Sequence, residues 1–120
     1  MKESGLANEN ELAYASYDTF PVSDLHCLII PKRHVKDYFD LTDEEVIACN
    51  ELIKLIKKEI ELKDPSVEGF NLGTNAGQIA GQSILHCHIH LIPRRKGDVD
   101  NPQGGIRSVI PQKQHYKRKS

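Results

Sequence analysis

The sequence predicts an α+β fold, with a mostly antiparallel sheet packed against one long helix and a short helix. This prediction rests on one long amphipathic segment with a strong capping signal, and on shorter strand-like segments before and after it. At 120 residues the chain is long enough for one core, and it contains no internal repeat or interdomain linker. We therefore expect a single domain.

Two strands are predicted in the N-terminal part of the chain, over residues 11–17 and 25–30. The second is apolar apart from His26, and we expect Pro31 to end it because proline has no N–H for the sheet ladder. Their short, turn-prone connection favours a hairpin. A short helical turn is expected within residues 33–40.

The long helix is predicted over residues 42–63. Thr42 suits the N-cap position and Glu45 its capping-box partner. Asp64 and Pro65 end the helix. One apolar stripe at three- and four-residue spacing is expected to face the sheet: Val46, Cys49, Ile53, Ile56 and Ile60.

The C-terminal half is predicted to return to strands. Residues 67–74 form one, and a glycine-containing loop then leads into another over residues 83–93. We expect Pro93 to end this last strand and residues 94–105 to form a polar turn region.

The expected organisation is a mobile N-terminal segment over residues 1–10, a folded domain over residues 11–112 and a basic tail over residues 113–120. The N-terminal segment is short and polar, which leaves the start of the chain unpinned. The tail is interpreted as a solvated terminus in preference to a contact with a phosphate-bearing ligand.

Composition predicts a cytoplasmic protein. The three cysteines are odd in number and lie in apolar stretches, which is typical of reduced thiols and not of a disulfide framework. The polar N-terminus lacks a signal sequence, and no segment has membrane-spanning length, so we expect no membrane partner. A net charge of −1 gives no reason to expect nucleic acid as a partner.

Three histidines at alternate positions, His86, His88 and His90, are the most informative feature of the chain. In a strand, a period of two places all three imidazoles on one face. The apolar residues of the run would then face the core: Leu85, Cys87, Ile89 and Leu91. The upstream run Asn-Ala-Gly-Gln-Ile-Ala-Gly-Gln-Ser can bring backbone N–H groups close to an anion, which points to phosphate chemistry.

Three interpretations of this motif compete. A neutral imidazole at His88 can attack phosphorus if its other nitrogen bonds an acceptor, such as the backbone carbonyl two residues away. A His-x-His pair is also a common zinc or iron ligand. The imidazoles could instead be structural. Residue chemistry favours phosphorus over metal, because no Asp or Glu lies within the triplet.

The run Gln82-Ser-Ile-Leu-His-Cys-His-Ile-His-Leu-Ile-Pro-Arg is similar to the signature of the histidine triad (HIT) family. The segment over residues 18–34, with its His-Cys-Leu-Ile-Ile-Pro-Lys-Arg-His run, resembles the same family. The later Asn-Pro-Gln-Gly-Gly-Ile-Arg looks like its prokaryotic dinucleoside polyphosphate hydrolase-like branch. The resemblance covers about residues 10–112 and implies a HIT-like fold.

The resemblance implies nucleotidyl hydrolysis or transfer at the α-phosphate of a dinucleoside polyphosphate or a nucleoside phosphoramidate. By that likeness His88 attacks the α-phosphorus and carries the nucleotidyl group until water releases the monophosphate. His90 matches a contact to the phosphate and leaving group, and His86 supports the constellation. The alternative is a nucleotide-binding regulator or scaffold without significant turnover.

The family likeness also implies a substrate site. Asp18 occupies the ribose-contacting position, where a carboxylate can accept from both hydroxyl groups. His26 matches a further histidine near the phosphate. The phosphate loop is matched by Asn75, Gly81, Gln82 and Ser83. The Ser83 hydroxyl can donate to a bridging oxygen, so Ser83 is also counted as catalytic.

Many relatives of this branch bind zinc through an N-terminal Cys-x-x-Cys pair and two histidines, at the positions of His34 and His86. The first ten residues here contain no cysteine, so we expect no structural zinc and no metal ligand. Nucleophilic attack needs no divalent metal, and magnesium is expected only as the complex of a polyphosphate substrate. The expected partners are a purine nucleotide and a second copy of the chain, bound through the long helix or an edge strand.

Overall fold

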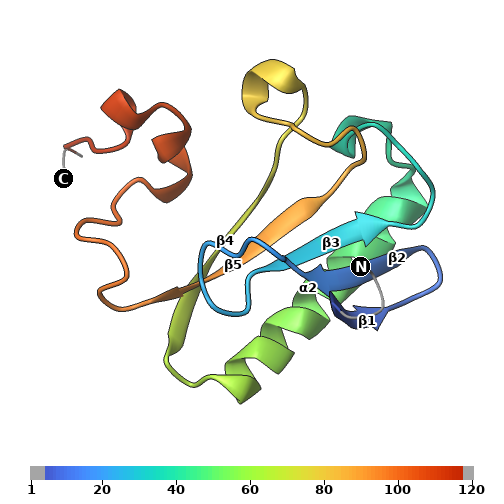
Figure 1. Ribbon diagram of the computed structural model, residues 1–120, viewed down its shortest axis with the longest axis horizontal. Coiled ribbons are helices and arrows are strands. Elements are labelled where there is room, and N and C mark those ends of the chain that lie inside the picture. Colours follow the sequence, from blue (N-terminus) through green and yellow to red (C-terminus); the bar gives the residue numbers. More distant parts are fainter. Residues whose placement is uncertain (1–4, 118–120) are drawn as a thin grey trace.

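Five antiparallel strands form one sheet in the computed structural model, which describes residues 5–117. The strands are β1 (Leu6–Glu9), β2 (Ala13–Tyr17), β3 (Cys27–Pro31), β4 (Val67–Thr74) and β5 (Ile89–Arg95). Their order across the sheet is β1-β2-β3-β5-β4. Helix α2 (Asp43–Lys63) crosses one face of this sheet (Figure 1). The predicted α+β fold is confirmed, and β2 and β3 form the predicted hairpin.

Helix α2 begins at the predicted capping box. The Thr42 hydroxyl accepts from the Glu45 N–H at 3.1 Å, and the Glu45 carboxylate accepts from the Thr42 N–H at 2.9 Å. The same carboxylate accepts two hydrogen bonds from Arg33, at 2.8 and 2.9 Å. These bonds lower the pKa of Glu45 to about 2. The short helical turn expected in this region is a 3-10 turn over Tyr38–Asp40.

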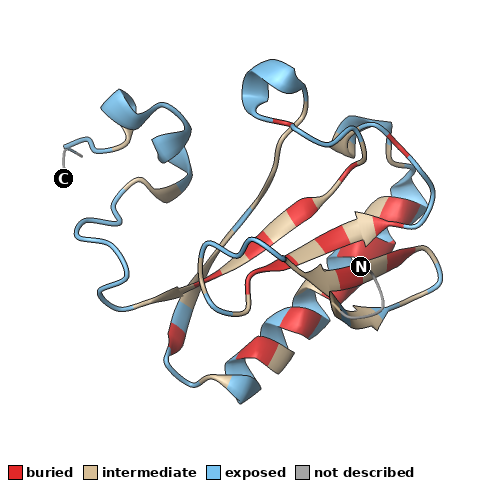
Figure 2. Ribbon diagram, viewed as in Figure 1, coloured by how far each residue is buried: buried red, intermediate tan, exposed pale blue. Residues whose placement is uncertain are grey.

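The core lies between α2 and the facing side of the sheet, where the buried positions gather (Figure 2). Alternate residues of β2 and β3 reach it, as a half-buried sheet requires: Ala13, Ala15, Cys27 and Ile29. The helix contributes Ala48, Cys49, Leu52, Ile56 and Ile60. The predicted stripe is confirmed at Cys49, Ile56 and Ile60, whereas Val46 and Ile53 lie at its half-buried margin.

The second half of the predicted mobile N-terminal segment belongs to the sheet. Leu6–Glu9 pairs with β2 as an edge strand. Asn10 makes the turn, because its side-chain oxygen accepts from the N–H groups of Leu12 and Ala13. Its side-chain nitrogen also donates to the Ala48 carbonyl on α2. These side-chain bonds carry no periodic signal, so the strand was not predicted. Residues 1–4 lie outside the described part of the chain.

Pro31 is the last residue of β3, as predicted, whereas Pro93 lies inside β5, which continues to Arg95. Pro31 pairs with Ala13, and Pro93 pairs with Phe70. Pairing between β3 and β5 covers only residues 27–29 of β3, so each proline has a neighbouring strand on one side alone. A missing N–H is tolerated at such an edge-like position.

The last part of the chain forms a C-terminal arm, residues 98–117, that extends beyond the sheet (Figure 1). It contains short 3-10 turns at Gly105–Val109 and Pro111–Lys113. Side-chain bonds from Gln114 and His115 to backbone oxygens of residues 101–103 fold the arm back on itself. The predicted tail thus begins inside a turn, and residues 118–120 lie outside the described range. No helix within residues 5–117 is long and apolar enough to cross a membrane.

Candidate active site

The nucleophile expected at His88 lies just before β5, not inside a strand. The strand begins at Ile89, and Leu85 is 64% exposed where a core position was expected. The backbone is held here by hydrogen bonds, from the Cys87 N–H to the Val35 carbonyl at 2.8 Å and from the Thr74 hydroxyl to the His88 carbonyl at 2.7 Å. Sequence reasoning missed Thr74, which carries no signal beyond its place at the end of β4.

One hydrogen bond determines the tautomer of His88. Its Nδ1 lies 2.9 Å from the carbonyl oxygen of His86, and a carbonyl oxygen can only accept. The proton of the neutral ring is therefore on Nδ1, and Nε2 keeps its lone pair. The predicted use of the carbonyl two residues away is confirmed.

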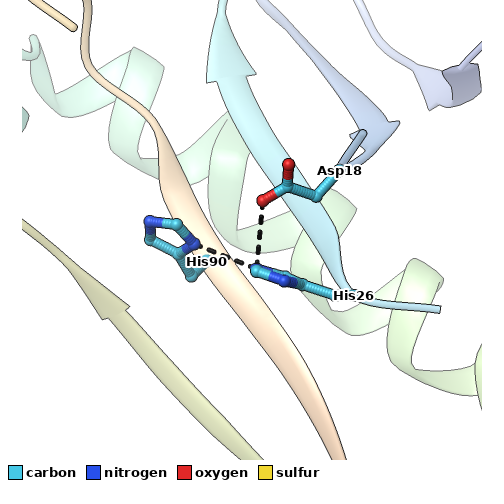
Figure 3. Close-up of side chains that lie close together, drawn as sticks. All are labelled: Asp18, His26 and His90. Atoms are coloured by element: carbon cyan, nitrogen blue, oxygen red, sulfur yellow. Dashed lines mark hydrogen bonds and ion pairs between the residues drawn. The ribbon is translucent and has the colours of Figure 1, made fainter. Parts of the chain in front are cut away.

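His90 has the opposite tautomer, imposed through His26. The Val22 N–H donates to Nδ1 of His26 at 3.2 Å, so His26 holds its proton on Nε2. That Nε2 lies 3.0 Å from Nδ1 of His90 and donates to it (Figure 3). His90 consequently holds its proton on Nε2. Sequence reasoning missed Val22, because its contribution is a backbone N–H.

Asp18 completes the cluster. One carboxylate oxygen lies 3.6 Å from Nε2 of His26 (Figure 3), and the other accepts from the Phe20 N–H at 2.9 Å. The backbone N–H of Asp18 also donates to the His26 carbonyl at 2.9 Å. Asp18 and His26, at the two ends of the loop between β2 and β3, are thus held together beside His90 of β5.

The imidazoles of His26 and His90 favour the neutral form. Burial is the main cause that lowers the pKa of each ring, because it disfavours the charged form. The neighbouring His26 and His88 lower the pKa of His90 further. The negative charge of Asp18 opposes burial in both rings. Neutral His26 and His90 are consistent with the hydrogen bonds from Val22 to His26 and from His26 to His90.

His86 is separated from the other two histidines by its contacts. Its Nδ1 and Nε2 each lie 3.2 Å from a carbonyl oxygen, those of Val35 and Pro31. Its ring stacks on His34, with centroids 4.7 Å apart. The ring therefore holds the segment after β3, while its backbone oxygen serves His88. The three imidazoles therefore do not form the expected single row. The rings of His88 and His90 are neighbours, whereas the ring of His86 contacts backbone carbonyls.

The predicted phosphate loop turns at two glycines, Gly77 and Gly81, both with φ of 99°. The side chain of Gln82 is buried and accepts from the Gly77 N–H while donating to the carbonyls of Lys36 and Ile84. Gln82 thus holds the loop with its side chain. Ser83 is exposed, and Asn75 is half-buried and lies close to Gly81.

Comparison with known protein families gives a match to the HIT domain over residues 2–97. The chain belongs to the HIT family. An uncharacterized HIT-like protein of Methanocaldococcus jannaschii is 40% identical over 91 residues, covering 75% of this chain and 68% of that protein. The adenosine 5′-monophosphoramidase hnt1 of Schizosaccharomyces pombe is 37% identical over 86 residues, covering 72% of this chain and 61% of that enzyme.

Solved structures agree with this assignment. A crystal structure of a HIT family protein from Bacillus anthracis matches with a TM-score of 0.73 at 37% identity, over 78% of this chain and 66% of that one. The predicted HIT membership is confirmed, and the assignment to one branch stays a prediction. The chain spans between 61% and 68% of the lengths of the two HIT relatives above.

The expectation of no structural zinc stays a prediction. His34 and His86 are there, but the first ten residues contain no cysteine. Both ring nitrogens of His86 face carbonyl oxygens at 3.2 Å, and zinc on that ring would displace one of these contacts.

Within residues 5–117, one cluster of side chains has donor atoms close enough together to bind a metal ion. Donor atoms of Asp18, His26 and His90 lie within 4.8 Å of one another. To bind a metal through Nε2, His26 would have to move its proton to Nδ1, which faces the Val22 N–H. The tautomer of His26 therefore disfavours metal binding through its Nε2.

A cavity of about 520 Å³ lies beside the HIT site, between β5 and the C-terminal arm. None of the triad histidines lines it. Its links to the site are Val22, whose N–H bonds His26, and Ile92, two residues after His90 on β5.

Proposed function

We propose that this HIT protein is a nucleotidyl hydrolase or transferase that cleaves a nucleoside phosphate derivative at its α-phosphate. The observation that carries the proposal is the pair of opposite tautomers. His88 donates from Nδ1 and offers a lone pair on Nε2, whereas His90 accepts on Nδ1 and offers a proton on Nε2. A nucleophile and a hydrogen-bond donor thus stand on neighbouring rings, 5.3 Å apart between centroids.

The proposed reaction has two displacements at phosphorus. Nε2 of His88 attacks the α-phosphorus and forms a nucleotidyl-histidine intermediate as the leaving group departs. The Nε2–H of His90 contacts the phosphate and leaving group. Water then attacks the same phosphorus and releases the nucleoside monophosphate. No divalent metal is required for attack, because neutral imidazole is itself the nucleophile.

The proposed substrate contacts follow the family likeness. The Asp18 carboxylate accepts from the ribose hydroxyls, and His26 lies near the phosphate. The phosphate is held by the loop of Asn75, Gly81, Gln82 and Ser83, with the exposed Ser83 hydroxyl donating to a bridging oxygen. Phe20, which is 86% exposed two residues after Asp18, offers its ring to a purine base.

We take a nucleoside phosphoramidate as the first substrate class, because the S. pombe relative is named an adenosine 5′-monophosphoramidase. A dinucleoside polyphosphate is the second. It is favoured by the run Asn101-Pro-Gln-Gly-Gly-Ile-Arg and would enter as its magnesium complex. The three free, buried thiols suit a reducing compartment, so we place the activity in the cytoplasm.

The second copy expected from the family is also proposed. Strand β4 is one edge of the sheet and exposes Leu72, and α2 exposes Leu55 and Leu62. Apolar side chains on an edge strand and a helix face suit self-association. Light scattering should give twice the 13.6 kDa mass of one chain, and a monomer at assay concentration would contradict the dimer.

The deciding experiment is a product assay with nucleoside phosphoramidates and dinucleoside polyphosphates. His88→Ala should lower kcat by roughly 10⁴-fold or more, while the Kd for the monophosphate stays within about tenfold. Acid quench of wild-type protein with a slow substrate should trap an acid-labile nucleotidyl adduct on His88.

His115→Ala is the matched control, since His115 is exposed on the C-terminal arm. Undiminished turnover in His88→Ala would contradict the covalent route. Tight nucleotide binding with no turnover by the wild-type protein would favour the regulator or scaffold instead.

A further inference from the structure

The proton on Nε2 of His26 has two acceptors within reach. Nδ1 of His90 lies 3.0 Å away, and a carboxylate oxygen of Asp18 lies 3.6 Å away (Figure 3). We propose that Asp18, acting through His26, allows His90 to take up a second proton and to serve as the general acid for the leaving group. The inference rests on the proposed function and goes beyond a ribose contact by Asp18.

Neutral His90 is a hydrogen-bond donor but a poor acid. Loss of its single proton would leave an imidazolate anion, which is inaccessible near neutral pH. An amine leaving group must gain a proton as the bond from phosphorus to nitrogen breaks. His90 can supply it only if both of its ring nitrogens carry protons first.

The neighbouring contacts allow one arrangement for doubly protonated His90. Its Nδ1 then bears a proton and can no longer accept from His26. His26 cannot shift its own proton to Nδ1, because that nitrogen faces the Val22 N–H at 3.2 Å. The His26 ring must therefore tilt so that its Nε2–H points to Asp18, the second acceptor within reach.

The charges around His90 support this role for Asp18. Burial, His26 and His88 lower the pKa of His90, and Asp18 is the group that raises it. Asp18 also raises the pKa of His26 against burial. The β3 and β4 residues paired with His90 are Leu28 and Gly73, which are uncharged. A bound phosphate anion adds to the effect of Asp18.

The proton and bond changes balance over one turnover. Nε2 of His88 bonds to phosphorus, the phosphorus–nitrogen bond breaks, and the Nε2 proton of His90 passes to the departing nitrogen. His90 is then neutral, with its proton on Nδ1 and a lone pair on Nε2. Water bonds to phosphorus, its proton goes to Nε2 of His90, and the bond from phosphorus to His88 breaks. Both rings return to their starting states.

The test separates proton supply from ribose binding. A 2′,3′-dideoxynucleoside 5′-phosphoramidate has no hydroxyl groups for Asp18 to bind, so any effect of Asp18→Asn on kcat acts through His26. We expect kcat on this substrate to fall roughly tenfold or more. The basic limb of the pH profile should move about one pH unit lower. On the matching 4-nitrophenyl ester, whose leaving group needs no proton, kcat should change less than about threefold.

Asp24→Asn is the matched control, as Asp24 is an exposed carboxylate in the same loop. Equal kcat values for wild type and Asp18→Asn on both substrates would overturn the proposal, whatever happens to KM. NMR titration of the His90 ring with inorganic phosphate present needs no turnover. It should give a lower pKa in Asp18→Asn, and an unchanged pKa would also overturn the proposal. Failure of the covalent route would appear separately, as turnover that survives His88→Ala.

Discussion

Nδ1 of His88 lies 2.9 Å from the backbone oxygen of His86, so one triad histidine sets the tautomer of the next without using its own ring. The ring of His86 is engaged elsewhere, against the carbonyls of Pro31 and Val35. Residues 31–36 thus hold the backbone around His88, the proposed nucleophile, so we expect a side chain that moves this backbone to affect the proposed catalysis.

Removing the His86 ring should reduce catalysis more than binding. In His86→Ala the two ring contacts are lost and the carbonyl that orients His88 is less well held, so we expect kcat to fall roughly 10- to 100-fold. KM should change less than about threefold. His34→Ala, which removes only the stacked partner, is the comparison variant in the same kinetic assay. A large loss of nucleotide affinity in His86→Ala would instead indicate a direct phosphate contact.

The Gln82 side chain should be needed for the shape of the phosphate loop. Gln82→Glu replaces the donor group that bonds the Lys36 and Ile84 carbonyls with an acceptor. We expect a loss of about 1–3 kcal/mol in the free energy of unfolding, together with a higher KM. Chemical denaturation and steady-state kinetics measure the two effects. Gln78→Glu, at an exposed position of the same loop, should leave both unchanged.

Mild acid should destabilise the fold through His26 and His90. The pKa of each ring is lowered from 6.5 in the folded state, mainly by burial. A depressed folded pKa means that the stabilisation is complete above about pH 6.5 and is lost as the pH falls through the folded values. Urea unfolding should therefore give a lower free energy at about pH 5.5 than at about pH 7.5. His26→Asn should flatten this dependence and His115→Ala should not, and a profile that rises toward acid would refute the explanation.

The capping box of α2 should contribute to stability without affecting turnover. Thr42→Ala removes one side-chain cap and should cost about 1 kcal/mol. For a domain of this size that corresponds to a Tm about 4 °C lower. The pKa of Glu45 is about 2, so its contribution is complete above its usual 4.5 and is lost as the pH falls toward 2. Differential scanning calorimetry measures both effects. An unchanged Tm in Thr42→Ala would show that Arg33 alone holds the helix start.

Phe20 should act on binding of the base alone. Its ring is 86% exposed, so Phe20→Ala removes little packing from the free protein. A lost stacking contact is worth about 1–3 kcal/mol, which predicts a KM for a purine substrate roughly tenfold higher with nearly unchanged kcat. Phe39→Ala provides the reference, because Phe39 is comparably exposed at 80% and lies outside the site. Equal KM values for the two variants would exclude Phe20 from the base site.

The fold could be predicted where the signals are local. Thr42 and Glu45 are three residues apart, and their capping box is made within one turn of chain. Strand β1 is an exception, because the side-chain bonds by which Asn10 makes its turn leave no periodic signal, and Asn10 also bonds Ala48, 38 residues later. The place of Pro93 inside β5 depends on the end of the β3–β5 pairing at Leu91, which no local signal reveals.

The site shows the same limit. A period of two correctly grouped His88 and His90, whose rings are neighbours. It could not separate His86, because the carbonyls that hold that ring come from residues 51 and 55 positions away. Nor could it identify Gln82 as the side chain that holds the loop, since its partner Lys36 is 46 positions away.

Cys27, Cys49 and Cys87 are all buried, and burial raises the pKa of their thiols to about 12, 11 and 11. Since the thiolate is the form that alkylating agents attack, the folded molecule should be almost inert to them. The rate of alkylation would then measure how often the structure opens. Cys87 lies between His86 and His88, so its labelling would monitor the opening of the segment that holds the proposed nucleophile, in the wild-type protein and without any added probe group.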